Sequence, residues 1–173
     1  TEDLTYALAK VVTDVPAVLS RRVDPRSGLV VVWGRVSAGE AINVIPSTGV
    51  AQGTLRMLDV GLWEEIGPLL HEVVADVVRP YGVTAAVDHI RGVPPVVNDE
   101  ACAQLAAQAV TDVLGEDGVG EADQSSGGED FGWYTEEIPG IYLRLGVWDG
   151  DSDETDLHHP AFMLDERALP IGA

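Results

Sequence analysis

The run Leu29-Val30-Val31-Val32-Trp33 lies directly after Asp24-Pro25-Arg26-Ser27-Gly28, and the first half of the chain is built around it. A short apolar run behind a group of turn-forming residues is typical of a buried strand. A second strand is predicted within residues 42–57, where Pro46-Ser47-Thr48-Gly49 interrupts the apolar pattern. Proline cannot donate a ladder hydrogen bond, so Pro46 favours an edge or a bend at that point.

Two amphipathic helices are predicted on either side of this strand pair. The first begins at Thr1-Glu2-Asp3, which supplies a capping hydroxyl and two acids, and Pro16 is expected to disturb its end. The second follows Asp59 and ends at Pro80-Tyr81-Gly82, after which residues 83–90 predict a third strand. This order lacks only a leading strand to make the split β-α-β unit of a ferredoxin-like sandwich.

The sequence after residue 93 predicts a different kind of unit. Asn98 is expected to cap a helix that Gly115 closes, residues 141–147 predict one strand, and a short helix is expected near Asp165. Two helices, one strand and long loops cannot bury a good core by themselves, so this half needs a sheet from elsewhere.

Charge divides the chain at the same place. The 173 residues include 10 Lys or Arg and 29 Asp or Glu, which gives a net charge of −19. Residues 1–93 carry 8 basic and 11 acidic groups, whereas residues 94–173 carry 2 and 18, and we expect a domain boundary between them. The acidic balance excludes nucleic acids and anionic membranes as partners, because both require a basic surface. With a single cysteine and no apolar run long enough for a membrane span, a cytoplasmic location is expected.

Nucleophilic and nucleotide-binding chemistry find no support in the sequence. No G-x-S-x-G, G-x-G-x-x-G or P-loop pattern is present, and Cys102 falls on the apolar face of its predicted helix, as a structural thiol does. Metal binding has better support, since His158 and His159 follow the acidic residues of 149–156. Either one histidine ligates a metal, or both belong to a solvated loop.

Asn43 and Arg56 are polar residues in apolar surroundings. Arg56 is the only charged residue between Glu40 and Asp59, and a planar guanidinium in such a stretch suits bidentate capture of a carboxylate. The alternative is that Arg56 points outward from a strand and that Asn43 pairs with a turn.

Five ordered motifs, followed by a C-terminal Leu169-Pro170-Ile171-Gly172-Ala173, make the chain resemble a known enzyme family. The family is that of the metal-dependent amidohydrolases related to aminoacylase and zinc carboxypeptidase, in the branch of hippurate hydrolase and indole-acetyl-amino-acid hydrolase. The motifs are Ala41-Ile42-Asn43-Val44-Ile45-Pro46, Gly53-Thr54-Leu55-Arg56, Pro94-Pro95-Val96-Val97-Asn98-Asp99, Ser126-Gly127-Gly128-Glu129-Asp130-Phe131 and Leu157-His158-His159-Pro160.

The resemblance implies part of a two-domain enzyme that cleaves the amide bond of N-acyl-amino acids or related small peptides. Residues 1–93 correspond to a ferredoxin-like lid that dimerises and here lacks its first strand. Residues 94–173 correspond to the last stretch of an α/β catalytic domain that holds two divalent metal ions, zinc or manganese. The fold class expected is therefore a mixture of α+β and α/β.

The resemblance also implies roles for three residues. His158 matches a metal ligand, and Asn43 and Arg56 match a lid pair that grips the substrate, with the arginine on the carboxylate and the asparagine often reaching across a homodimer. The family's other metal ligands and its general base have no counterpart here, so we expect no catalytic residue and no activity from this chain alone. Two alternatives stay open: a non-catalytic dimerisation module and an acidic metal-storing fragment.

Overall fold

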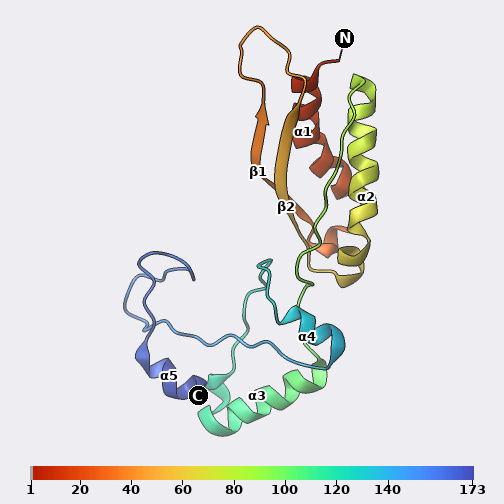
Figure 1. Ribbon diagram of the computed structural model, residues 1–173. Helices are drawn as coiled ribbons and strands as arrows, with labels where there is room; N and C mark the ends of the chain where they lie inside the picture. The colour runs from red at the N-terminus through yellow and green to blue at the C-terminus, as the bar shows by residue number, and fades with distance from the viewer. Residues whose placement is uncertain (1) are drawn as a thin grey trace.

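The computed structural model describes residues 2–173 and shows a mixed α/β chain with one small sheet (Figure 1). The hairpin unit, residues 4–82, contains the strands and the two long helices. The C-terminal segment, residues 94–173, contains three shorter helices and long loops, and it traces an open arc in Figure 1. The elements in chain order are α1 (Leu4–Arg22), β1 (Val30–Ala38), β2 (Gly49–Arg56), α2 (Val60–Val78), α3 (Glu100–Leu114), α4 (Gly132–Glu137) and α5 (Leu169–Gly172), with 3-10 turns at Pro25–Ser27, Arg79–Tyr81, Glu116–Gly118 and Glu166–Ala168.

Aspartate caps start both long helices. The Asp3 carboxylate accepts a hydrogen bond from the amide of Tyr6 at 3.0 Å, and the Asp59 carboxylate accepts one from the amide of Leu62 at 2.6 Å. Each carboxylate satisfies an amide that has no partner within its helix. The predicted second helix is confirmed, although its last residue is Val78 and the Arg79–Tyr81 turn follows it.

Helix α1 continues through Pro16 to Arg22, so the predicted disturbance at its end is wrong. Proline has no amide hydrogen, and the carbonyl four residues earlier, that of Val12, therefore lacks its helical donor. The indole Nε1 of Trp33 donates to this carbonyl at 3.1 Å. A strand residue thus replaces the missing hydrogen bond and ties β1 to α1.

Strands β1 and β2 form an antiparallel hairpin that runs from the pair Val30–Arg56 to the pair Ala38–Gly49. A bulge between Trp33 and Arg35 leaves Gly34 without a partner. The first predicted strand is confirmed and is longer than expected, whereas the second begins only at Gly49. Residues 42–48 form the connecting loop instead of a strand.

The core lies between the hairpin and the two helices. Every fourth residue of α1 from Ala7 to Leu19 is buried, as are six residues of α2. Val31, Trp33 and Leu55 pack on them from the sheet. Val30 and Val32 point to the opposite face and are about half exposed, at 48% and 51%. The buried helix residues are Ala7, Val11, Val15 and Leu19 in α1 and Trp63, Ile66, Leu70, Val73, Val74 and Val78 in α2.

Residues 83–90 do not form the predicted third strand. The segment lies along the helical layer, with Val87 packed against the core and His89 next to Gly67 of α2. A strand needs a neighbouring backbone to complete its hydrogen bonds. The only ladder found in residues 2–173 is the one between β1 and β2, and it does not reach this segment.

The C-terminal segment has no core of its own, as the sequence predicts. Within residues 94–173 only Pro94, Gly132 and Ala168 are buried, and α3 has no buried residue. Residues 141–147 form no strand, which corrects another expectation. Within residues 2–173, no helix has the length and apolar character needed to cross a membrane.

Asn98 has a different role from the one predicted. The residue that caps α3 is Asp99, whose carboxylate accepts from the amide of Cys102 at 2.9 Å. The Asn98 side chain instead accepts from the Tyr142 amide at 2.8 Å and donates to the Tyr142 carbonyl at 3.2 Å. The asparagine therefore offers residue 142 the two hydrogen bonds that a neighbouring strand provides.

Candidate functional site

Arg56 lies at the end of β2, where the hairpin unit meets a loop of the C-terminal segment. Its Nη1 donates to the carbonyl oxygen of Ser126 at 3.2 Å. The residue is exposed, and no ion pair within residues 2–173 includes it. A guanidinium has five N–H donors in a planar fork, so the contact with Ser126 leaves donors for an anionic group.

The loop that contacts Arg56 is held by its own hydrogen bonds and by aromatic rings. Ser125 Oγ accepts from the Gly127 amide at 3.1 Å, and Phe131 lies 5.9 Å from the Tyr142 ring, between centroids. A hydrogen bond to Glu129 raises the pKa of the Tyr142 hydroxyl. The Ser126–Phe131 motif is thus anchored to residue 142 while its first carbonyl faces Arg56.

Asn43 is not brought near Arg56 in one protomer. It is exposed in the loop between β1 and β2, and Arg56 is at the other end of β2. At roughly 3.3 Å per residue, the strand alone separates the two ends by about 23 Å. One substrate molecule of amino-acid size cannot contact both side chains of the same chain.

His158 has the only left-handed backbone among the non-glycine residues of 2–173, with φ of 75°. Such a conformation is uncommon outside glycine and is enriched at functional sites. His159 is occupied locally, because its Nδ1 accepts from the Ala161 amide at 3.2 Å. The His158 side chain is exposed and is the freer of the two imidazoles.

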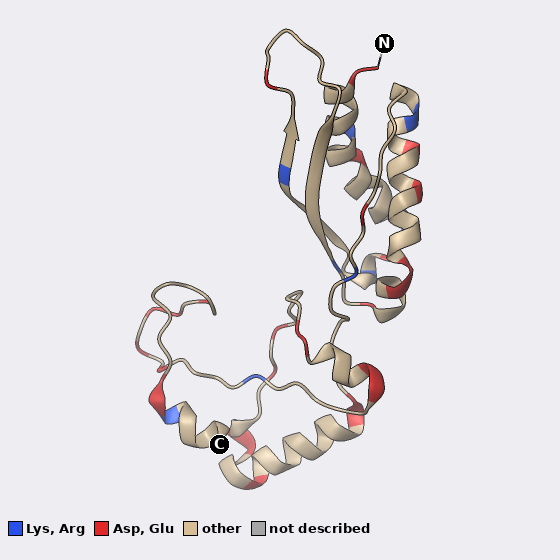
Figure 2. Cartoon of the chain, viewed as in Figure 1, with Lys and Arg blue, Asp and Glu red and all other residues tan. Residues whose placement is uncertain are grey.

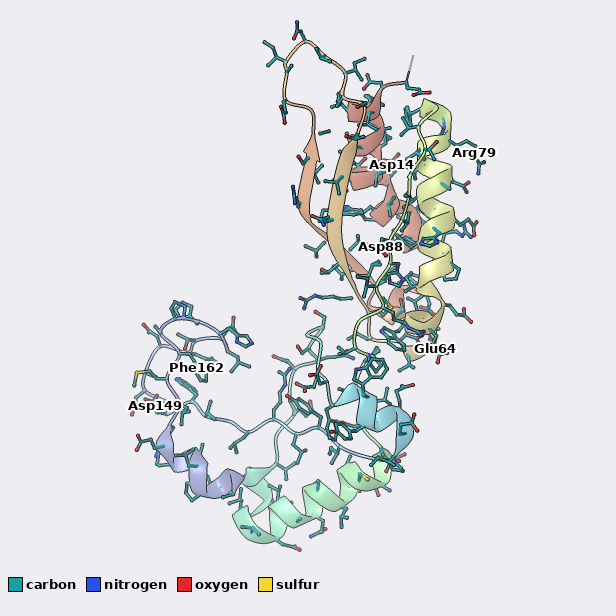
Figure 3. The ribbon with its side chains drawn as sticks, in the orientation of Figure 1. Asp14, Glu64, Arg79, Asp88, Asp149 and Phe162 are labelled. Atoms are coloured by element: carbon teal, nitrogen blue, oxygen red, sulfur yellow. The ribbon has the colours of Figure 1, made fainter. Side chains whose placement is uncertain are left out.

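The acidic loop before the histidines is organised by hydrogen bonds of its own. Asp149 accepts from the amides of Asp151 and Ser152 and from the Ser152 hydroxyl, and these bonds lower its pKa. Figure 3 shows Asp149 of this loop and Phe162, which follows the histidines, on the far side of the C-terminal segment from Glu64 of α2. Figure 2 shows acidic groups over much of this segment.

Residues 2–173 contain no group of three His, Cys, Asp or Glu side chains placed to hold a metal ion. A protein metal site needs at least three such donors. The His158 imidazole could therefore be one ligand of a metal site that other residues complete. The described residues do not form a complete metal centre.

Sequence comparison with known protein families gives a match that covers residues 6–173, to the peptidase family M20/M25/M40. The chain belongs to the peptidase M20 family. The resemblance inferred from the sequence motifs is therefore confirmed.

Two relatives and one solved structure illustrate the similarity. A Rhodococcus jostii protein provisionally named glutamate–cysteine ligase 2-3 is 46% identical over 99% of this chain and 22% of its own length. N-acetylcysteine deacetylase of Bacillus subtilis is 34% identical over 99% of this chain and 43% of its own length. The crystal structure of Bacillus subtilis YxeP, a dinuclear metal-binding peptidase of the M20 family, superposes with a TM-score of 0.74 at 29% identity, over 93% of this chain and 41% of that one.

This M20 chain spans less than half of each of these proteins. The M20 match and the structural superposition support hydrolase chemistry with divalent metals at the level of the family. The mixed α/β fold with its small sheet also agrees with the M20 structure.

Cys102, expected as a buried thiol, is only partly buried. It lies in α3, and a hydrogen bond to Asp99 together with burial raises its pKa. A raised pKa keeps the thiol protonated and unreactive at neutral pH. No nucleophilic role is therefore assigned to it.

The sequence did not indicate Ser126 as the partner of Arg56, nor Tyr142 as the residue that anchors the Ser126–Phe131 loop. The Ser126 contact uses a backbone carbonyl, which any residue provides, so the residue type carried no signal. Tyr142 is bonded through its backbone by Asn98 and through its side chain by Glu129, and only the amide of Asn98 in front of a helix hinted at such pairing.

Proposed function

We propose that this chain is the lid and the last catalytic-domain stretch of an M20 hydrolase that cleaves the amide bond of N-acyl-amino acids or small peptides. In this proposal residues 1–93 correspond to a ferredoxin-like lid, of which the structure has two helices and two strands but no strand at 83–90, and residues 94–173 belong to the catalytic domain. The observation that carries the proposal is the position of Arg56, which has free N–H donors and lies against the Ser126–Phe131 loop.

Arg56 binds the free carboxylate of the substrate in this proposal. A carboxylate offers two oxygens that match the guanidinium fork, and such charge-assisted pairs are about twice as strong as neutral hydrogen bonds. The Ser126 carbonyl is a neutral acceptor at 3.2 Å and orients the fork while leaving its other donors free.

Asn43 acts in the active site of a partner subunit in this proposal. The length of β2 keeps it away from Arg56 of its own chain, whereas in a homodimer formed through the lid it reaches the substrate bound by the other subunit. This arrangement gives both residues of the pair a place at one substrate.

His158 supplies one ligand to a centre of two divalent metal ions, zinc or manganese, that residues outside this chain complete. Divalent ions in such hydrolases polarise the scissile carbonyl and activate water. This chain holds no catalytic residue, and by itself it is inactive.

N-acylated cysteine is the first substrate to test. One relative, 34% identical, is named as an N-acetylcysteine deacetylase. The carboxylate of such a compound is the group that Arg56 binds.

The experiment compares N-acetylcysteine with its methyl ester as substrates of the full-length enzyme and of its Arg56→Ala variant. One lost charge-assisted hydrogen bond of about 1.5–3 kcal/mol lowers kcat/KM for the acid by roughly 10- to 150-fold. The ester should change little. Arg35→Ala is the matched control, because Arg35 is an exposed strand arginine whose side chain contacts only Gln52, at 3.4 Å. Equal losses on the acid and the ester would refute the carboxylate role.

A further inference from the structure

A cluster of two tryptophans and one arginine joins the hairpin unit to the C-terminal segment, and the proposed function does not use it. The ring of Trp63, in the first turn of α2, lies 5.7 Å from the ring of Trp133, in the first turn of α4, at an interplanar angle of 74°. The guanidinium carbon of Arg91 lies 4.6 Å from the centre of the Trp63 ring. We call these three residues the tryptophan junction.

Both contacts have geometries that are attractive in themselves. An edge-to-face arrangement places the positive edge of one ring against the negative face of the other. A guanidinium over an indole is the most favourable common cation–π pair. Arg91 forms no ion pair within residues 2–173, so the indole is its main partner in the structure.

The connecting segment between the two units passes directly beside the junction. Arg91 lies near the end of this segment, residues 83–93, and Pro94, which follows it, is among the most deeply buried of residues 2–173. A Cβ added at Gly132, next to Trp133, would lie 2.4 Å from the Pro94 carbonyl oxygen. Helix α4 therefore rests on Pro94, directly after the connecting segment, and Figure 3 shows Glu64, the neighbour of Trp63, at the start of α2 above α4.

A short, tightly held stretch of chain links the tryptophan junction to Arg56. Only residues 57–59 separate the end of β2 from the start of α2. Met57 is buried in the core, and the Leu58 amide donates to the Ser27 carbonyl at 2.8 Å. Arg56 and Trp63 thus belong to one packed unit, so a shift of this unit relative to α4 would also change the position of Arg56 relative to the Ser126–Phe131 loop.

We propose that Trp133 is a positioning residue, which docks on Trp63 and Arg91 and thereby holds Arg56 against the Ser126–Phe131 loop in the orientation that binds the substrate carboxylate. This inference rests on the proposed carboxylate role of Arg56. Trp133 itself touches no substrate. Trp63 is 8% exposed and belongs to the core, whereas Trp133 is 50% exposed, so Trp133 is the member that can be changed without unfolding the hairpin unit.

The test uses the full-length enzyme with N-acetylcysteine as substrate. Loss of the docking contact lowers the fraction of molecules in the competent orientation, and the apparent affinity falls by that fraction. Trp133→Ala should raise KM roughly three- to tenfold, the size expected for an aromatic pair, with kcat unchanged. Trp133→Phe keeps an edge-to-face contact and should restore most of the affinity. Tyr6→Ala is the matched control, because it breaks a similar aromatic pair, with Tyr81 at 5.4 Å, that lies within the hairpin unit.

The double variant decides whether Trp133 acts through Arg56. In the Arg56→Ala background, Trp133→Ala should have no further effect on kcat/KM, because the group that it positions is absent. A full additional loss, a fall in kcat with KM unchanged, or no effect of Trp133→Ala in the wild-type background would overturn the proposal.

A spectroscopic measurement separates failure of this inference from failure of the proposed function. Two indoles in contact give an exciton couplet in circular dichroism, and Trp133→Phe should remove it while Trp148→Phe leaves it. An intact couplet in Trp133→Phe would overturn the docking geometry whatever the kinetics. Failure of the proposed function is recognised independently, by equal losses of Arg56→Ala on acid and ester.

Discussion

The hairpin contains two glycines whose replacement by alanine should have opposite effects on its stability. Gly53 faces Trp33 across the hairpin, and a Cβ there would lie 2.4 Å from the Val32 carbonyl oxygen and 2.9 Å from the Trp33 ring. A backbone oxygen cannot yield without opening the ladder, so Gly53→Ala should destabilise the hairpin by about 1–3 kcal/mol. Gly34, in the bulge, has no atom within 4 Å of its added Cβ. Gly34→Ala should stabilise the hairpin by about 0.4–1 kcal/mol, because alanine restricts the unfolded chain.

Hydrogen exchange of the β1 and β2 amides in the full-length enzyme measures this difference directly, because it reports local opening rather than global unfolding. Exchange should become roughly 5- to 150-fold faster in Gly53→Ala and slightly slower in Gly34→Ala. Amides of α3 provide an internal reference that neither change should move. Equal acceleration in both variants, or none in Gly53→Ala, would refute the packing argument.

Three further predictions concern the dimer, the metal and pH. If Asn43 serves the partner's site, mixing Asn43→Ala and Arg56→Ala subunits in equal amounts, with dissociation and reassociation, should restore activity. Half of the dimers then contain one subunit of each kind and one intact site of two, so about a quarter of wild-type activity should return. No recovery would place both residues in one subunit's site. His158→Ala should lower the metal content by elemental analysis, whereas His159→Ala should keep it; unchanged metal in both would refute ligation by His158. The pKa of Asp99 is lowered by the amide that it caps, so its contribution to α3 is complete above the ordinary aspartate pKa near 3.9 and is lost as pH falls through the lower native value; circular dichroism should show an acid transition of α3 that Asp99→Asn weakens.

The helices and the hairpin were predictable because local patterns specify them. The apolar spacing from Ala7 to Leu19 marks the buried face of α1, and Asp59 marks the start of α2. The effect of Pro16 was not predictable, because the indole that compensates for its missing hydrogen bond comes from Trp33, a residue that only the folded hairpin brings to α1. Local sequence shows the loss of a helical donor but not its replacement.

The two strands that failed to form show the limit of apolar patterns. Residues 83–90 and 141–147 have the composition of strands, but a strand exists only when a second backbone lies beside it. The site shows the same limit: the role of Arg56 was expected from a family motif, whereas its contact at Ser126 is a backbone carbonyl that no motif indicates. The roles of Asn43, Arg56 and His158 stay predictions.

The two-stranded sheet has a consequence for handling this chain apart from other parts of an enzyme. A ribbon of two strands has an edge on both sides, and within residues 2–173 neither outer edge is paired with a further strand. The face bearing Val30 and Val32 is also open to solvent. Unpaired edges next to apolar side chains recruit other chains by sheet extension. We therefore expect concentrated solutions of the separate chain to form β-rich aggregates, and its high negative charge to delay this process at low salt and less so as salt screens the repulsion.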